Sequence, residues 1–178
     1  MSSFELGSYI VDHHAVLRHV LAMKPTGVAL EFGVGAGDSL RVIAARMPVI
    51  GFDSFQGLPE DWRDGYPKGM FACKPPKPGR RAALVVGMFE DTLPGFEFPK
   101  RVGLVHIDCD LYSSTATVLK YVGPHLEPGT FVVFDEWHGF EGCEEFEQRA
   151  WREYADDTGI CWEVIGHGVQ QWAIRIVP

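Results

Sequence analysis

Residues 28–38 read V-A-L-E-F-G-V-G-A-G-D and open with a short apolar run that ends at Glu31. Three glycines then alternate with other residues, and an amphipathic stretch follows at 39–46. This order predicts a strand, a tight loop and a helix, because glycine accepts the positive φ angles of tight turns. Unpaired N–H groups at the start of that helix favour a nucleotide-like ligand against the loop. An ordinary glycine-rich turn is the alternative interpretation.

The spacing of the glycines separates two classes of cofactor. A dinucleotide fingerprint requires G-x-G-x-x-G, and counting from Gly33 and Gly35 its third glycine would fall on Asp38. The motif is instead E-x-G-x-G-x-G, completed by Gly37. The Glu31 carboxylate would attract a cationic amino acid group and repel a pyrophosphate. The spacing therefore favours S-adenosylmethionine over NAD.

Composition limits the other function classes. The chain has 178 residues, 46% of them hydrophobic, which is enough for one well-buried domain and too few for two ordinary ones. A formal net charge of −8 argues against nucleic acid or a membrane as the partner, because both favour a basic surface. We expect a small-molecule partner, and a homodimer is one arrangement open to the chain. Four scattered cysteines predict free thiols, and no signal or spanning segment is visible, so a cytoplasmic location is expected.

Apolar runs alternate with helical patterns along the chain. Residues 8–23 carry an apolar stripe that predicts an N-terminal helix within 1–26. Strands are expected at 28–31, 48–53, 82–86, 102–108 and 129–134, and further helices at 39–46, 112–122 and 144–157. A hairpin of 161–165 and 171–177 ends the chain. We therefore predict a doubly wound α/β sandwich with a seven-stranded, mostly parallel sheet and a C-terminal antiparallel hairpin.

Carboxylates follow four of the first five predicted strands, at the edge where ligands bind in doubly wound sheets. They are Glu31, Asp53, Asp108 with Asp110, and Asp135 with Glu136. Asp53, with Ser54 beside it, is expected to contact the cofactor ribose; a turn cap is the alternative. Crowded carboxylates repel one another unless a cation relieves them, so the last two pairs predict Mg²⁺. Caps of the following helix and loop are the alternative there.

Two further segments are expected near this edge. Residues 57–81 lack periodicity and hold five prolines, which predicts either a substrate lid or a solvated surface loop. Met88 and Phe89 follow the third predicted strand and are expected either against an adenine ring or in the core. The helix at 112–122 is expected to be capped by a serine, Ser113 or Ser114.

Three segments carry a resemblance to a known family. They read H-I-D-C-D-L-Y-S-S-T from His106, P-G-T-F-V-V-F-D-E-W from Pro128 and G-F-D-S-F-Q-G-L-P-E-D-W from Gly51. Spaced in this way around the glycine motif, they resemble the macrocin O-methyltransferase family. Members are class I S-adenosylmethionine-dependent methyltransferases, and several use Mg²⁺ to methylate sugar hydroxyls in antibiotic biosynthesis. The resemblance covers residues 27–177.

The resemblance and the residue patterns together define the expected site. The expected cofactor contacts are Glu31, Phe32, Gly33, Gly35, Gly37, Asp53, Ser54, Met88, Phe89 and Asp108, and the metal ligands implied by the family are Asp108, Asp135 and Glu136. The implied reaction transfers a methyl group to an acceptor hydroxyl, with Asp110 or His138 taking the proton. His106, inside a predicted strand, is interpreted as a core histidine. The chain departs from the family pattern at Glu136, where the antibiotic enzymes carry Asp, and in the short segment before the first strand.

Three other functions are compatible with these patterns. An NAD(P)-dependent reductase would share the fold, although the third glycine is missing and no Tyr-x-x-x-Lys proton relay is recognisable. A module that holds the cofactor without catalysis, for a partner protein, is the second. A metal-independent methyltransferase with His138 as its base is the third.

Overall fold

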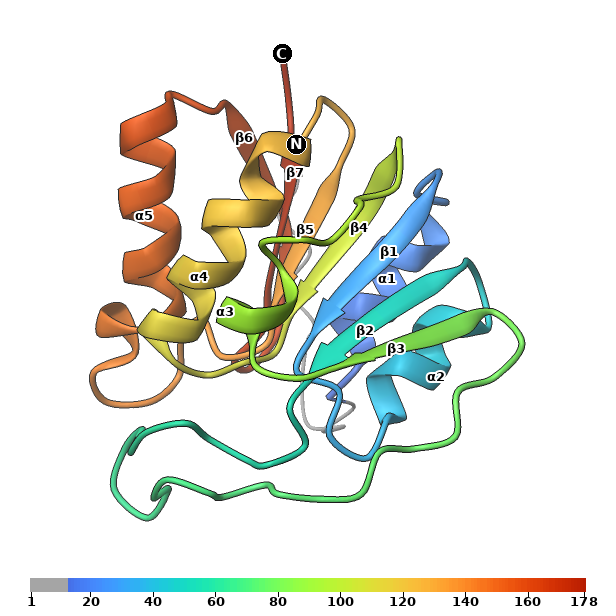
Figure 1. The fold of residues 1–178 in the computed structure, drawn as a ribbon. Coiled ribbons are helices and arrows are strands. Elements are labelled where there is room, and N and C mark those ends of the chain that lie inside the picture. Colours follow the sequence, from blue (N-terminus) through green and yellow to red (C-terminus); the bar gives the residue numbers. More distant parts are fainter. Residues whose placement is uncertain (1–12) are drawn as a thin grey trace.

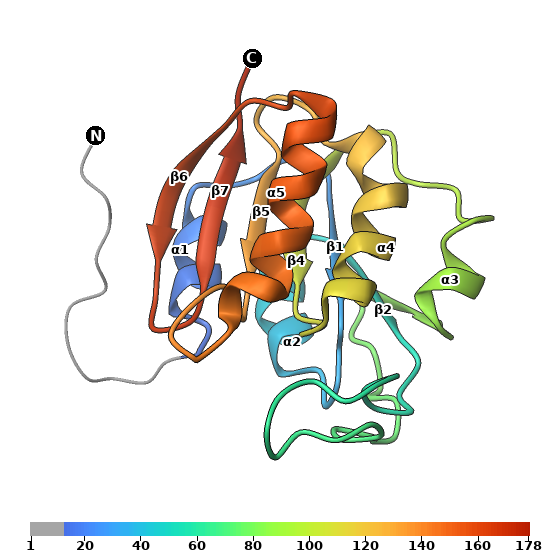
Figure 2. The same cartoon turned by 90° about the vertical axis from the view of Figure 1, so that its left-hand side faces the viewer.

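The computed structural model describes residues 13–178, which form one seven-stranded sheet with helices on both faces (Figures 1 and 2). The strand order is β3-β2-β1-β4-β5-β7-β6. The strands are β1 (Val28–Phe32), β2 (Val49–Asp53), β3 (Ala82–Val86), β4 (Val102–Ile107), β5 (Phe131–Phe134), β6 (Trp162–His167) and β7 (Trp172–Ile176). Strands β1 to β5 pair in parallel, and β7 runs antiparallel between β5 and the edge strand β6. The predicted fold class is confirmed.

The helices bury two separate apolar faces against the sheet. They are α1 (Ala15–Ala22), α2 (Asp38–Ala44), α3 (Phe89–Thr92), α4 (Tyr112–Val122) and α5 (Glu147–Thr158), with 3-10 turns at Gly123–His125 and Cys143–Glu145. Helices α1 and α2 pack on one face, and α3, α4 and α5 on the other (Figure 2). The part of the predicted first helix at 8–12 lies outside the described residues. Among the described residues, no helix combines the length and the apolar stretch needed to cross a bilayer.

Helix α4 has the predicted bounds, but its predicted serine cap was wrong, and so was the predicted start of α5. No serine side chain caps α4, whose N-cap residue is Leu111, and the Ser113 hydroxyl instead donates to Glu60 Oε1 at 2.5 Å. Helix α5 begins at Glu147 rather than near 144, because Phe146 has a non-helical backbone (φ −111°, ψ −116°) after a 3-10 turn. Both starts face the carboxyl edge of the sheet, where the chain makes contacts between loops instead of regular caps.

The topology opens a crevice at the carboxyl ends of β1 and β4. From β1 the chain passes through α2 to β2 on one side, whereas β4 and β5 continue on the other side, so the connections leave this edge in opposite directions. Ligands of doubly wound sheets bind at such a switch point. The long loop between β2 and β3 runs across the same edge (Figure 1).

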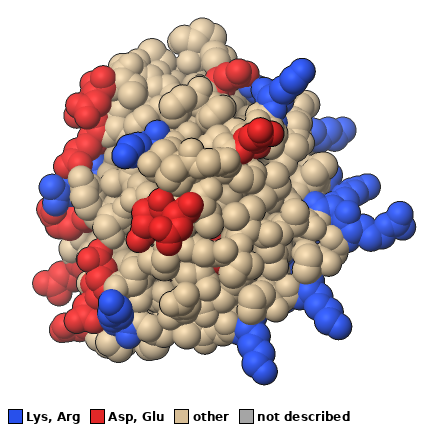
Figure 3. All heavy atoms as spheres, in the orientation of Figure 1, with Lys and Arg blue, Asp and Glu red and all other residues tan. Residues whose placement is uncertain are grey.

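Surface charge is unevenly spread over the molecule. Asp and Glu side chains gather at the edge where α5 lies in Figure 1, and Lys and Arg side chains at the opposite edge, beyond β3 (Figure 3). The net charge of −8 therefore does not describe a uniformly acidic surface.

Candidate active site

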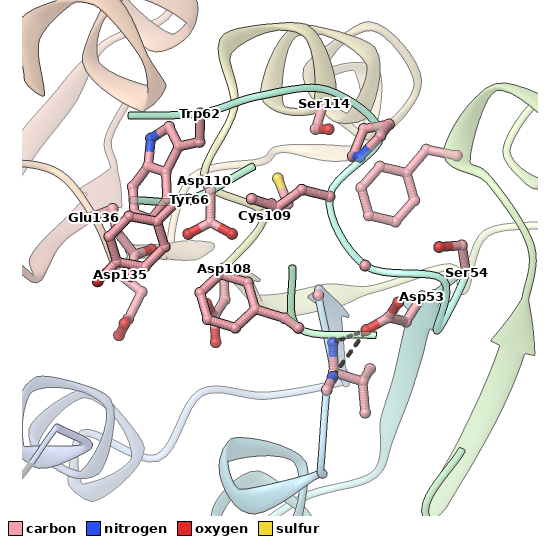
Figure 4. A pocket seen from close by; sticks show the side chains of 18 of the residues that line it. Asp53, Ser54, Trp62, Tyr66, Asp108, Cys109, Asp110, Ser114, Asp135 and Glu136 are labelled. Carbon is pink, nitrogen blue, oxygen red and sulfur yellow. Dashed lines mark hydrogen bonds between the residues drawn. The ribbon is translucent and has the colours of Figure 1, made fainter. Parts of the chain in front are cut away.

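A pocket of about 970 Å³ opens at the carboxyl ends of the central strands. This volume suits a cofactor together with a small substrate. Its wall includes many of the predicted site residues, namely Gly33, Gly35, Asp53, Ser54, Met88, Phe89, Asp108, Asp110, Asp135 and Glu136. The fold therefore brings the glycine loop, the end of β2 and the acids after β4 and β5 to one cavity (Figure 4).

Asp53 holds the glycine loop in place. Its Oδ2 accepts hydrogen bonds from the N–H groups of Val34 and Gly35, both at 2.8 Å (dashed in Figure 4), and its Oδ1 accepts from Phe55 N at 2.7 Å. The predicted turn cap accounts only for the Phe55 contact. Because a carboxylate offers about four acceptor sites, Asp53 can receive further donors from a ligand. The Ser54 hydroxyl accepts from Gln56 N at 3.1 Å.

Met88 and Phe89 both lie at the pocket, and Phe89 also joins the core, whereas contact with an adenine ring stays a prediction. Both line the pocket, and Phe89 also packs edge-on against Phe32, with ring centroids 5.7 Å apart. Gly37 lies outside the pocket lining, since it is the left-handed N-cap of α2 (φ 81°) and faces Pro76. Two of the three motif glycines therefore reach the pocket.

The side chains of Glu31 and Phe32 do not reach the pocket, contrary to expectation. Strand β1 runs one residue further than predicted, so Glu31 is paired with Gly51 and His106 inside the sheet instead of ending the strand. It is 0% exposed, and its Oε1 lies 3.0 Å from His106 Nδ1. Phe32 is equally buried, with its ring in the core. The interpretation of His106 as a buried, partnered histidine is confirmed; burial lowers its pKa, but Glu31 raises it above the usual value overall.

Three carboxylates meet where β4 and β5 end. Asp108, Asp135 and Glu136 can each place one oxygen within 4.8 Å of the others. Burial, followed by the charges of neighbouring acids, raises the pKa of Asp108 and of Glu136 well above the usual range. Glu136 Oε2 is buried without a hydrogen-bond partner. An all-oxygen donor set with an unpartnered buried oxygen fits a hard divalent cation such as Mg²⁺.

Asp110 is held in a strained turn beside these acids. Its φ is +64°, and Leu111 N donates to Cys109 O at 2.6 Å around it, which is a γ-turn. The side chain caps no helix, because the N-cap of α4 is Leu111 with no side-chain capping bond. Burial and the charge of Asp135 raise the pKa of Asp110 to about 7, while Arg63 acts in the opposite direction.

Glu147 is a further buried acid that we did not predict. It is 0% exposed, and its Oε2 accepts from the backbone N–H of Glu136 at 3.2 Å, while its Oε1 has no partner. Burial and the charges of Asp110 and Asp135 raise its pKa well above the usual range. The sequence contains one indication that Glu147 is buried. It lies one turn before Trp151 on the inner face of α5, where an acid cannot face solvent.

The long loop supplies the opposite wall of the pocket. Its residues Leu58 and Trp62 are buried against Leu111, and Tyr66 packs on the same cluster. Trp62, Arg63, Tyr66 and Phe71 line the cavity. The first half of the loop is therefore not a solvated excursion, and it takes the place that a lid would occupy.

His138 lies outside the pocket. Its backbone N–H donates to Gln170 O, which turns the side chain toward the C-terminal hairpin. There its ring lies 5.9 Å from that of His167 and 5.8 Å from that of Trp172, between centroids. Burial and the nearby His167 lower its pKa. This position does not suit a base that acts at the acid cluster.

Curated relatives match a little under half of the chain. It is 33% identical over 84 residues to 8-demethyl-8-(2,3-dimethoxy-alpha-L-rhamnosyl)-tetracenomycin-C 4'-O-methyltransferase of Streptomyces olivaceus, covering 43% of this chain and 31% of that one. It is 34% identical over 79 residues to mycinamicin III 3''-O-methyltransferase of Micromonospora griseorubida, covering 44% and 29%. The match thus spans about a third of the length of these relatives.

Solved structures share the fold over nearly the whole chain. The O-methyltransferase NovP has a TM-score of 0.70 at 22% identity, covering 94% of this chain and 78% of that one. CalS11, a calicheamicin methyltransferase, has a TM-score of 0.67 at 24% identity, covering 93% and 77%. An O-methyltransferase from Bacillus cereus in complex with SAH has a TM-score of 0.59 at 11% identity, covering 97% and 83%.

The family model described as macrocin-O-methyltransferase (TylF) matches residues 79–168. This segment holds the strand ends that carry Asp108, Asp135 and Glu136. Because the match spans just over half of the 178 residues, the chain belongs to the macrocin-O-methyltransferase (TylF) family.

Proposed function

We propose that this protein is an S-adenosylmethionine-dependent O-methyltransferase that acts on a hydroxyl group of a small molecule, such as a sugar or a natural product. The observation that carries the proposal is a single pocket in which a glycine loop braced by Asp53 faces a cluster of carboxylates. Family membership supports the same reaction class, and both curated relatives are named as O-methyltransferases.

The cofactor would lie along the glycine loop. Asp53 would accept from its ribose hydroxyls, and Met88 and Phe89 would pack on its adenine ring. S-adenosylmethionine would supply the methyl group as an electrophilic sulfonium, whose positive charge suits this pocket. Eight carboxylates and one arginine line the cavity, which disfavours the pyrophosphate of a nicotinamide cofactor.

The acceptor hydroxyl would bind at the acids beyond the cofactor. Asp108, Asp135 and Glu136 would hold Mg²⁺, which in such sites lowers the pKa of a bound hydroxyl and orients it. Asp110 would take the proton as the hydroxyl oxygen gains the methyl group. A carboxyl whose pKa is about 7 is suited to this role near neutral pH.

The location of the protein and its oligomeric state are two further parts of this proposal. All four cysteines are free thiols, which supports a reducing compartment such as the cytoplasm. A homodimer stays a prediction.

We expect S-adenosylhomocysteine to raise the melting temperature of the protein, and NAD or NADP to leave it unchanged. A ligand at one hundred times its dissociation constant stabilises the native state by about 2.7 kcal/mol, which a thermal shift detects readily. Differential scanning fluorimetry with each of the three ligands measures the effect. A shift with NAD or NADP and none with S-adenosylhomocysteine would reject the methyltransferase in favour of the reductase.

Asp53→Asn should weaken S-adenosylhomocysteine binding by about 10- to 100-fold, as expected when hydrogen bonds to a charged acceptor are lost. The substitution keeps the shape of the side chain but removes its charge and one acceptor oxygen. Isothermal titration calorimetry measures the affinity. Asp61→Asn is the charge-matched control and should leave the affinity unchanged, because Asp61 is exposed, lies outside the pocket lining and, among the described residues, accepts only Lys68 N at 2.7 Å. Equal affinities for wild type and Asp53→Asn would place the ribose elsewhere.

A further inference from the structure

Arg63 is the only Lys or Arg among the described residues that line the pocket. Its guanidinium carbon lies 4.1 Å from the ring centre of Trp62, 4.7 Å from that of Tyr66 and 4.1 Å from that of Phe140. Its Nε is buried without a hydrogen-bond partner. Arg63 forms no ion pair with any described carboxylate, although eight carboxylates line the same cavity.

The three rings explain why this arginine remains unpaired. Stacking on aromatic faces covers the flat sides of a guanidinium and fixes its position, but leaves its N–H edge free to donate. Trp62 and Tyr66 come from the long loop, whereas Phe140 follows β5, so the cage is fixed from two sides. This half-buried cation has no described carboxylate within ion-pair distance, although its charge acts on the nearby Asp110, so its N–H edge can still take up an anion.

The cage faces the part of the pocket where the acceptor would react. Trp62 and Tyr66 stand beside Asp110, Asp135 and Glu136 (Figure 4), while the braced glycine loop lies at the Asp53 end of the cavity. A ring whose hydroxyl is held at the acids would therefore extend along these aromatic side chains. Any anionic substituent on that ring would come within reach of the guanidinium.

We propose that Arg63 selects an acceptor that carries an anionic group, a carboxylate or a phosphate, on or next to the ring whose hydroxyl is methylated. This inference rests on the proposed function and deepens it. A guanidinium fork recognises both anions through paired N–H donors. The acids that line the cavity repel such a group, and Arg63 is the one Lys or Arg among the described lining residues that can offset this repulsion, so only an anion placed at the guanidinium would be accepted.

The test compares charged and neutral members of two probe pairs. The carboxylate pair is 3,4-dihydroxybenzoate and catechol, and the phosphate pair is glucose 1-phosphate and methyl glucoside. Dissociation constants are measured by calorimetry with S-adenosylhomocysteine and Mg²⁺ present. In at least one pair the charged member should bind wild type about tenfold or more tightly than the neutral one, and the pair that shows this identifies the anion.

Three variants separate charge in the pocket from charge elsewhere. Arg63→Gln should abolish the preference while changing the neutral affinity less than about threefold, and Arg63→Lys should keep part of it. Lys68→Gln should retain the full preference, because Lys68 is exposed in the same loop but outside the pocket lining. An unchanged thermal shift with S-adenosylhomocysteine verifies that Arg63→Gln is folded.

Several results would overturn the inference. Equal affinity for charged and neutral members of both pairs in wild type, or no binding of either charged member, would contradict it. So would a preference that survives in Arg63→Gln. A loss of S-adenosylhomocysteine affinity in that variant, with the preference intact, would instead assign Arg63 to the cofactor carboxylate. Failure of S-adenosylhomocysteine to stabilise wild type would reject the proposed function itself, which is a separate outcome.

Discussion

Gly33→Ala is expected to destabilise the protein by about 2 to 5 kcal/mol, the sum of a left-handed backbone penalty and local overpacking. Gly33 has a φ of +88°, and a Cβ atom built on it would lie only 1.7 Å from the backbone oxygen of Asp108. The ends of β1 and β4 cannot separate easily at this point, because Asp108 N donates to Phe32 O at 2.9 Å. Relief of the clash would therefore shift Asp108, so Mg²⁺ affinity should fall together with stability.

Gly35→Ala provides the matched control for this prediction. Gly35 also has a positive φ, +50°, but a Cβ atom there would have nothing within 4 Å. Only the backbone penalty applies, which is about 1 to 2 kcal/mol. Urea denaturation of the two variants and the wild type measures the difference. If Gly33→Ala proves as stable as Gly35→Ala, the close approach of β1 and β4 at the switch point is not as tight as described.

The fold and most of the candidate site were predictable, because both depend on local patterns. Apolar runs located the strands, and their parallel arrangement requires residues after consecutive strands to meet at one edge. Asp108, Asp135 and Glu136 are brought together by this rule alone, through the pairing of β4 with β5. Asp53 follows from the same rule, although its role in bracing the glycine loop depends on the approach of two loops.

The remaining features depend on contacts between distant segments. Glu31 was expected at the end of β1, but the strand continues to Phe32, because periodicity does not fix where a buried strand ends. Glu147 is part of the acid region only because α5 begins beneath Glu136. The aromatic cage of Arg63 joins Tyr66 to Phe140 across more than seventy positions, within segments that show no periodic pattern. Neither propensity nor spacing contains this information.

Asp108→Asn and Asp135→Asn should each weaken Mg²⁺ binding by at least about 100-fold, since the loss of outer-shell partners alone costs 10- to 100-fold. Both substitutions keep the side-chain shape while removing one charge. The apo variants should be as stable as the wild type or more so, because repulsion within the cluster is relieved. Calorimetric titration of Mg²⁺ with S-adenosylhomocysteine present measures the affinity, and thermal melts with EDTA measure apo stability.

Proton release gives this prediction a second readout. Burial raises the pKa of Asp108 and Glu136, so carboxyl groups that retain protons in the apo protein must lose them when the cation binds. The heat of Mg²⁺ binding to wild type should therefore vary with the ionisation enthalpy of the buffer. Glu90→Gln is the charge-matched control, because Glu90 lines the pocket but lies outside the three-carboxylate group. Its Mg²⁺ affinity should stay within about threefold of wild type, the small change expected for an exposed, screened charge.

Identical heats from wild type and Asp135→Asn would mean that these acids hold no metal, and that Asp110 must act on the acceptor without one.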